Sequence, residues 1–196
     1  MFWLILAILV WGVVHSVTAS LGFKDFLRRS LGDGFMRFYR LLYNVFSVIS
    51  FAPILYLTVA LPDRGLYQAS PPWSTLMLAG QGLSALLLLV AVLQTDSLSL
   101  VGLRQLFEEE KPGELVTKGF YRFIRHPLYT FGLSFLWLSP KVSLNSFILY
   151  VSLTIYILVG AYFEERKLLR EFGDEYKAYK SATPMLVPFL KFGGNK

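Results

Sequence analysis

Cysteine is absent from this 196-residue chain, which excludes disulfides, zinc–thiolate sites, iron–sulfur clusters and cysteine nucleophiles. Histidine occurs only at His15 and His126, so the short-spaced histidine pairs of a metal-binding helix are missing, as is a glycine-rich phosphate loop. Charged residues make up 16% of the chain, against about 25% in a typical soluble domain. We therefore expect no metal site, and the scarcity of charge argues against a soluble protein.

Apolar residues, in contrast, make up 55% of the chain, and the mean hydropathy is +0.52. A membrane span needs roughly 20 mostly apolar residues. Five stretches approach this length: 2–19, 39–61, 73–93, 127–138 and 144–163. The fourth is too short to cross straight, and Ser139-Pro140-Lys141 separates it from the fifth. We predict an all-α, polytopic membrane bundle of five helices in one domain (1–196), with the last two paired as a tight hairpin.

The basic residues lie almost entirely on one side of these spans. Seventeen of the 19 lysines and arginines fall between spans one and two (extended to Arg40), between spans three and four, or after span five. Only Arg64 and Lys141 fall on the other side. By the positive-inside rule we expect the N-terminus outside and the C-terminus cytoplasmic. If the chain is bacterial, this membrane would be the inner membrane. The same rule explains the net charge of +6 without a nucleic-acid partner, and the first stretch is expected to stay as a membrane helix.

Two polar groups stand at the ends of apolar stretches. Pro127 suits the first position of a helix, so His126 would lie at a helix N-terminus that favours anions, with the forked donor of Arg125 beside it. The alternative is that Arg125 fixes topology and His126 only caps the helix. Glu164 and Glu165 directly follow the fifth apolar stretch, where carboxylates are paired or functional unless they are simply solvated. A hairpin would return them to the level of Arg125, so we expect a Glu–Arg contact.

The tail after Glu165 carries apolar and aromatic residues every three or four positions. This spacing predicts a helix that continues the fifth span. Pro184 and Pro188 would then end it.

Taken together, these pieces form a two-part motif. It reads L-V-T-x-G-x-Y from Leu115 to Tyr121, R-H-P-x-Y from Arg125 to Tyr129, E-E-x-x-L-x-x-x-F-G-x-x-Y-x-x-Y from Glu164, and P-x-x-x-P from Pro184. This pattern, over 115–188, resembles the membrane methyltransferases typified by isoprenylcysteine carboxyl methyltransferase, with phospholipid N-methyltransferases and small-thiol S-methyltransferases as relatives. The N-terminal half, through His15-Ser16, Lys24 and the stretch 39–44, more loosely resembles the bacterial NnrU and methanethiol methyltransferase group.

The resemblance implies S-adenosylmethionine as cofactor and a lipophilic or membrane-partitioning acceptor, such as a small molecule or a lipid, at the cytoplasmic face. It places the cofactor-binding core in 115–188. The candidate cofactor-binding residues are Gln105, Glu114, Leu115, Val116, Gly119, Tyr121, His126, Pro127, Leu128, Tyr129 and Glu164. The candidate catalytic residues are Arg125 and Glu165. Methyl transfer depends mainly on in-line positioning of the reacting groups in a dry site.

Two positions depart from the prenylcysteine enzymes, which commonly have an arginine where this chain has Gly160 and often a histidine where it has Gly113. Gly160 argues against a prenylcysteine carboxylate as acceptor, while a lipid amine, a small thiol or another lipophilic nucleophile stays open. One alternative is a nicotinamide-dependent relative of the sterol reductases. Those usually have asparagine where this chain has Leu128. A non-catalytic membrane subunit is the other alternative.

Overall fold

The computed structural model of the chain, which describes residues 1–108 and 114–188, is mostly helical. Four helices are long and apolar enough to cross a membrane: α1 (Phe2–Ala19), α2 (Leu21–Ala60), α3 (Trp73–Leu93) and α6 (Leu144–Ala182). Only 6% to 11% of their most apolar 18-residue windows is buried inside the protein. An apolar surface of this extent suits contact with lipid, and the all-α membrane fold predicted from the sequence is confirmed.

The predicted fourth span corresponds to α5 (Pro127–Trp137), which has only 11 residues. At about 1.5 Å per residue it is too short for a straight crossing, so the count of five spans stays a prediction. The short connection from α5 to α6, residues 138–143, includes strand β2 (Lys141–Ser143). The remaining short elements are β1 (Gly65–Gln68), α4 (Ser97–Val101) and two 3₁₀ turns, η1 (Arg104–Leu106) and η2 (Gly119–Arg122).

The chain divides into two compact units, which are described separately. Unit 1 consists of Met1–Gly65, Asp96–Pro112 and Ser143–Leu149. Unit 2 consists of Leu66–Thr95, Gly113–Val142 and Tyr150–Lys196.

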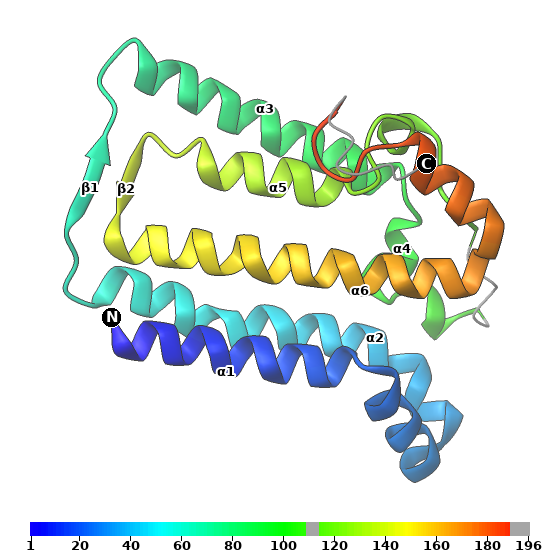
Figure 1. Cartoon of the computed structure of the whole chain (residues 1–196). Helices are drawn as coiled ribbons and strands as arrows, with labels where there is room; N and C mark the ends of the chain where they lie inside the picture. The colour runs from blue at the N-terminus through cyan, green and yellow to red at the C-terminus, as the bar shows by residue number, and fades with distance from the viewer. Residues whose placement is uncertain (109–113, 189–196) are drawn as a thin grey trace. The chain divides into compact units, whose positions relative to one another are not determined.

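Unit 1 is built on α1 and α2, which lie side by side (Figure 1). α2 begins at Leu21, well before the apolar stretch that the sequence marks at 39–61, and it bends at Gly32, where φ is 78°. Two hydrogen bonds join these helices. The Trp11 indole in the middle of α1 donates to Ser50 Oγ at 3.2 Å, and the Tyr39 hydroxyl donates to the Thr18 carbonyl near the end of α1. The basic segment between the first two spans is therefore helical rather than a loop.

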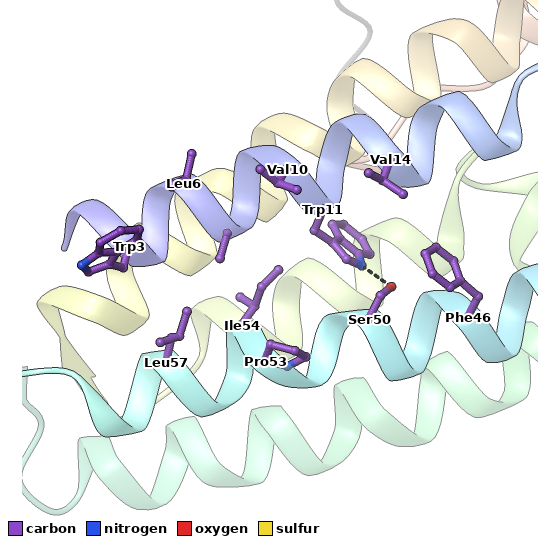
Figure 2. A pocket seen from close by; sticks show the side chains of 11 residues that line it. Trp3, Leu6, Val10, Trp11, Val14, Phe46, Ser50, Pro53, Ile54 and Leu57 are labelled. Atoms are coloured by element: carbon purple, nitrogen blue, oxygen red, sulfur yellow. Dashed lines mark hydrogen bonds between the residues drawn. The ribbon is translucent and has the colours of Figure 1, made fainter.

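A groove of about 550 Å³ lies between α1 and α2 (Figure 2). Its lining is apolar apart from the indole nitrogen of Trp11 and the hydroxyl of Ser50, which are hydrogen-bonded to each other. The lining residues are Trp3, Leu6, Ala7, Val10, Trp11, Val14, Phe46, Ser50, Pro53, Ile54 and Leu57. None of these side chains can exchange a proton near neutral pH, so the groove suits hydrocarbon rather than acid–base chemistry.

Unit 2 is built on α3, α5 and most of α6. α5 packs against α3, where the Gln81 amide donates to the Phe135 carbonyl at 2.8 Å (Figure 1). α5 is tied to α6 by a hydrogen bond of 3.0 Å from the Trp137 indole to Thr154 Oγ1. These contacts fix the C-terminal end of this short helix on two sides.

α6 continues past its apolar part into the polar tail, as predicted, and ends at Ala182. It is interrupted at Gly173, where φ is 54° and ψ is −124°. The last turns fold back from this point (Figure 1). We call residues 174–182 the arm and residues 183–186, which follow it, the strap.

Candidate functional site

The site is built around the N-terminus of α5. His126 is the residue that precedes the helix and Pro127 is its first residue, as the sequence predicts. Both are buried, and only 6% of His126 is exposed. Proline fits here because its missing N–H would have no partner inside the helix. The imidazole of His126 therefore lies buried beside the first turn of α5.

Glu165 lies just beyond the apolar part of α6 and is surrounded by cations. Its Oε1 accepts from Arg125 Nε at 2.6 Å and lies 3.3 Å from His126 Nε2, while Oε2 is 2.8 Å from Lys180 Nζ. The predicted Glu–Arg contact is confirmed. Burial alone would raise the pKa of Glu165, but the hydrogen bonds from His126, Lys180 and Arg125 outweigh it and lower this pKa to about 2. Glu165 is therefore an anion at neutral pH, with its charge committed to these partners.

Glu164, the preceding residue, is held differently. Its side chain is 45% exposed. Its Oε2 accepts a hydrogen bond of 2.8 Å from the Tyr129 hydroxyl and lies 3.7 Å from His126 Nδ1. The rings of His126 and Tyr129 stack, with centroids 5.2 Å apart and an interplanar angle of 13°. This carboxylate is oriented by α5 but remains accessible to a cationic ligand.

The strap covers the backbone in front of α5. The amide of Arg125 donates to the Pro184 carbonyl at 2.9 Å, and that of His126 donates to the Met185 carbonyl at 3.1 Å. These two amides are therefore already used, and an anion at this helix end would meet the first-turn amides of Leu128 and Tyr129, which have no acceptor within a helix.

The side chains on either side of these amides reinforce the strap. The Arg125 guanidinium also donates to the carbonyls of Lys180 and Thr183. The Thr130 hydroxyl donates to the Leu186 carbonyl at 2.7 Å. Residues 180–186 are thus bound to the start of α5 through both backbone and side-chain groups.

Tyrosines complete the surroundings. Tyr121 is half-buried in η2, and its carbonyl accepts from the Tyr179 hydroxyl at 2.6 Å. Burial, and secondly the charge of Glu164, raise the pKa of Tyr121 to about 12. Tyr176 is 1% exposed, and its hydroxyl has no hydrogen-bond partner within the described part of the chain. A buried hydroxyl without a partner is unusual in folded proteins and fits a site that completes its hydrogen bonds with a ligand.

Leu115 and Val116 are half-buried in the irregular chain before η2, and Leu128 is half-buried in α5. Glu114 is exposed. Gln105 belongs to unit 1, where its amide donates to Ser99 Oγ at 2.9 Å, so its cofactor role stays a prediction.

Gly119 begins η2 with φ at 62°, a conformation that favours glycine. A Cβ at this position would collide with the side chain of Gln94, whose Oε1 accepts from the Phe120 amide at 2.8 Å. A glycine is therefore required here by space as well as by backbone conformation.

Sequence reasoning missed several residues that hold the cluster together: Lys180, Thr183, Met185 and Gln94. Lys180 stands 15 positions after Glu165, a spacing that does not bring two residues of a continuous helix together. The strap contributes backbone carbonyls, which carry no residue-specific signal. Across residues 1–108 and 114–188, no three histidine, aspartate or glutamate side chains are grouped to hold a metal ion.

Comparison with known proteins adds a family and several relatives. A family model described as NnrU protein matches residues 3–191. The methanethiol S-methyltransferase of Pseudomonas deceptionensis is 30% identical over 201 residues, which cover 95% of this chain and 72% of that protein. Methanethiol S-methyltransferase 1 of Bradyrhizobium diazoefficiens is 27% identical over 192 residues, covering 95% of this chain and 66% of its own length.

A third relative matches a shorter region. The methanethiol S-methyltransferase of Crocosphaera subtropica is 35% identical over 109 residues, covering 53% of this chain and 43% of that protein. No solved structure shows a significant match.

Proposed function

Because the chain belongs to the NnrU protein family and is a methyltransferase-type membrane enzyme, we propose that it transfers a methyl group from S-adenosylmethionine to a small thiol at the cytoplasmic face. The observation that carries the proposal is the contrast between adjacent carboxylates. Glu165 is buried and fully engaged by cations, whereas Glu164 is half-exposed and oriented by Tyr129. A site in which one carboxylate remains accessible suits a ligand that carries an ammonium group.

The residues fit this cofactor group by group. Glu164 would accept from its ammonium group, and the first-turn amides of Leu128 and Tyr129 would donate to its carboxylate. The faces of Tyr121 and Tyr129 would lie against the adenine or the sulfonium. The buried Tyr176 hydroxyl, which lacks a partner among the described residues, has hydrogen-bonding capacity for a ligand. When bound, S-adenosylmethionine supplies a methyl group that its positive sulfur already activates.

We assign positioning roles to Arg125 and Glu165, the two candidate catalytic residues. Their charges face each other, and only 10% of the Arg125 side chain and 6% of the Glu165 side chain are exposed. Both charges are paired within the protein. Their contribution would be to fix His126 and the start of α5, and thereby the in-line geometry on which the rate depends.

The small-thiol acceptor is suggested by the relatives, which are named for methanethiol. Gly160 stands where a carboxylate-binding arginine would be expected for a prenylcysteine, which argues against that acceptor class. The acceptor's sulfur would gain the methyl group and release its proton to water, so no buried charge is left behind. A small apolar product then leaves through lipid or water without a dedicated binding group.

The cytoplasmic placement of the site is supported by the charge asymmetry, because 17 of 19 basic residues fall on the side of Arg125 and the arm. The absence of cysteine makes a direct test available. A cysteine introduced as Glu175→Cys should be protected from an impermeant thiol reagent in intact cells, while Leu66→Cys should react. The reverse pattern would overturn the orientation.

Cofactor binding is tested by calorimetric titration of the detergent-purified protein with S-adenosylhomocysteine. Wild-type protein should bind it, and Glu164→Ala should weaken binding by about tenfold or more, since a hydrogen bond to a charged group is worth about 1.5–3 kcal/mol. Glu171→Ala, an exposed carboxylate on the same helix, is the matched control and should bind normally. Lack of binding by wild-type protein would reject the cofactor, and normal binding by Glu164→Ala would reject the site.

The acceptor is tested with a methyl-labelled donor. Membranes that contain the protein are incubated with labelled S-adenosylmethionine, with and without methanethiol, and label is measured in volatile, lipid and protein fractions. Thiol-dependent label in the volatile fraction, as dimethyl sulfide, is expected. Label that appears in lipid regardless of the thiol would replace the small thiol with a lipid acceptor.

A further inference from the structure

Glu165 and Lys180 belong to one helix, α6, yet their side chains form an ion pair of 2.8 Å. In a straight α-helix, 15 residues correspond to about 22 Å along the axis. The contact exists only because the chain reverses at Gly173, where φ is 54° and ψ is −124°. The reversal therefore brings the arm back onto the polar end of its own helix.

Gly173 is required by backbone conformation and not by space. A Cβ at this position would meet nothing within 4 Å. Residues with a side chain rarely adopt this positive φ, which costs them of order 1–3 kcal/mol. A glycine here thus permits the chain reversal that precedes the arm.

The folded-back arm contacts the residues proposed to surround the cofactor. The Lys180 carbonyl accepts from the Arg125 guanidinium at 3.1 Å, and the Tyr179 hydroxyl donates to the Tyr121 carbonyl at 2.6 Å. The strap that follows it occupies the amides of Arg125 and His126. Three points of the site are therefore fixed by the arm or its continuation.

The two oxygens of Glu165 divide these contacts. Oε1 faces Arg125 and His126, while Oε2 faces Lys180. Without the ammonium group, Oε2 would lose its ion-pair partner, whereas Oε1 would keep Arg125 and His126. The carboxylate would then turn toward other donors and draw Arg125 and His126 out of their present positions.

We propose that Lys180 is a positioning residue of the cofactor site, which acts on His126 and Arg125 through Glu165 and depends on the chain reversal at Gly173. This inference rests on the proposed function, since it concerns the same site. Lys180 itself makes no contact with a reacting atom in this scheme. Its ammonium group determines where Glu165 points, and Glu165 determines where the start of α5 lies.

The first experiment compares Lys180→Met, Lys180→Arg and Lys177→Met with wild-type protein. Affinity for S-adenosylhomocysteine, KM for S-adenosylmethionine, kcat and the melting temperature are measured for each. Lys180→Met should raise Kd and KM about tenfold, leave kcat at saturating donor within about twofold, and lower the melting temperature only slightly, because the lysine side chain is 46% exposed. Lys180→Arg should restore most of the affinity, and Lys177→Met, an exposed lysine on the same arm, should behave as wild type.

The outcomes separate the two proposals. If wild-type protein does not bind S-adenosylhomocysteine, the proposed function fails. If it binds and Lys180→Met binds equally well, or if kcat falls as much as KM rises, the positioning role of Lys180 is wrong and the proposed function stands.

Gly173→Ala provides a second, independent variant. It should reduce the affinity for S-adenosylhomocysteine several-fold, whereas Gly32→Ala, at the positive-φ bend of α2, should not. Both substitutions introduce a comparable backbone cost, so their difference isolates the arm. Equal affinities for the two variants would overturn the dependence on the chain reversal, and this comparison holds even if Lys180→Met cannot be purified.

Discussion

The two histidines of the chain each lie against a tyrosine, but in different chemical surroundings. His15 in α1 stacks on Trp11 at 4.7 Å, and its Nε2 lies 2.8 Å from the Tyr43 hydroxyl. His126 stacks on Tyr129 at 5.2 Å and has both Glu165 and Glu164 within 4 Å. We refer to these as the His15 cluster and the His126 cluster.

The two clusters differ in composition. The His15 cluster includes the rings of Trp11 and Tyr43 and the Tyr43 hydroxyl, and it joins α1 to α2. The His126 cluster combines two carboxylates with Arg125 and Lys180, so its geometry depends on ions that a charged ligand can compete for or complete. The presence of a histidine next to a tyrosine is therefore not what marks a site in this protein.

The largest effect is expected from removing the central anion of the His126 cluster. Glu165→Ala leaves the buried Arg125 without its carboxylate, and breaking such a pair typically costs about 3–5 kcal/mol of unfolding free energy. Ser50→Ala, which removes the acceptor of Trp11 on the α1–α2 side, should cost only about 1 kcal/mol. Unfolding of both variants in the same detergent measures the difference, and similar losses would contradict it.

A smaller effect compares the two tyrosines. Tyr129→Phe removes the hydrogen bond that orients Glu164, and affinity for S-adenosylhomocysteine should fall several-fold, consistent with about 1 kcal/mol for one hydrogen bond. Tyr43→Phe removes the hydroxyl beside His15 and should leave that affinity unchanged while lowering the melting temperature slightly. Calorimetry and thermal unfolding of the two variants distinguish ligand binding from packing. An equal loss of affinity in Tyr43→Phe would mean that the His15 cluster also contributes to ligand binding, which would contradict the comparison.

The last prediction concerns the stability of the protein in acid, and at neutral pH this effect is absent. The pKa of Glu165 is about 2 in the folded protein, below its ordinary value of 4.5, so the folded state binds protons less readily than the unfolded state. Its stabilising contribution is fully present above about pH 5 and is lost as the pH falls from about 4.5 toward 2. Glu165→Gln should flatten this part of the stability curve, and an unchanged acid slope would contradict the assignment.

Much of this fold can be predicted from the sequence, because long apolar stretches and proline positions have local causes. The apolar runs identify α1, α3 and the start of α6, and Pro127 marks the first residue of α5. The contact of Arg125 with a glutamate follows from the hairpin, which returns the polar end of the fifth apolar stretch to the same side of the membrane as Arg125. Which of the two glutamates it meets does not follow, because that depends on side-chain packing.

The remainder depends on contacts between distant parts of the chain. The helical segment before residue 39 has no apolar pattern of a span, and α2 includes it only through a bend at Gly32. Lys180 and the strap reach the site through the reversal at Gly173, and the strap uses backbone carbonyls of Pro184 and Met185. A glycine in a polar helix indicates that the chain can change direction there. The direction that it takes is decided by the contacts that form afterwards.

The apolar part of α6 passes into the polar part without a linker. The 20 residues of its apolar stretch, 144–163, have a helical length of about 30 Å. Glu164 and Glu165 are the next two residues of the same continuous helix. A thicker or thinner bilayer changes how such a helix tilts or sits in depth. The height of both carboxylates above the lipid is thereby tied to membrane thickness, so the lipid composition of the host membrane becomes a determinant of how the His126 cluster meets water.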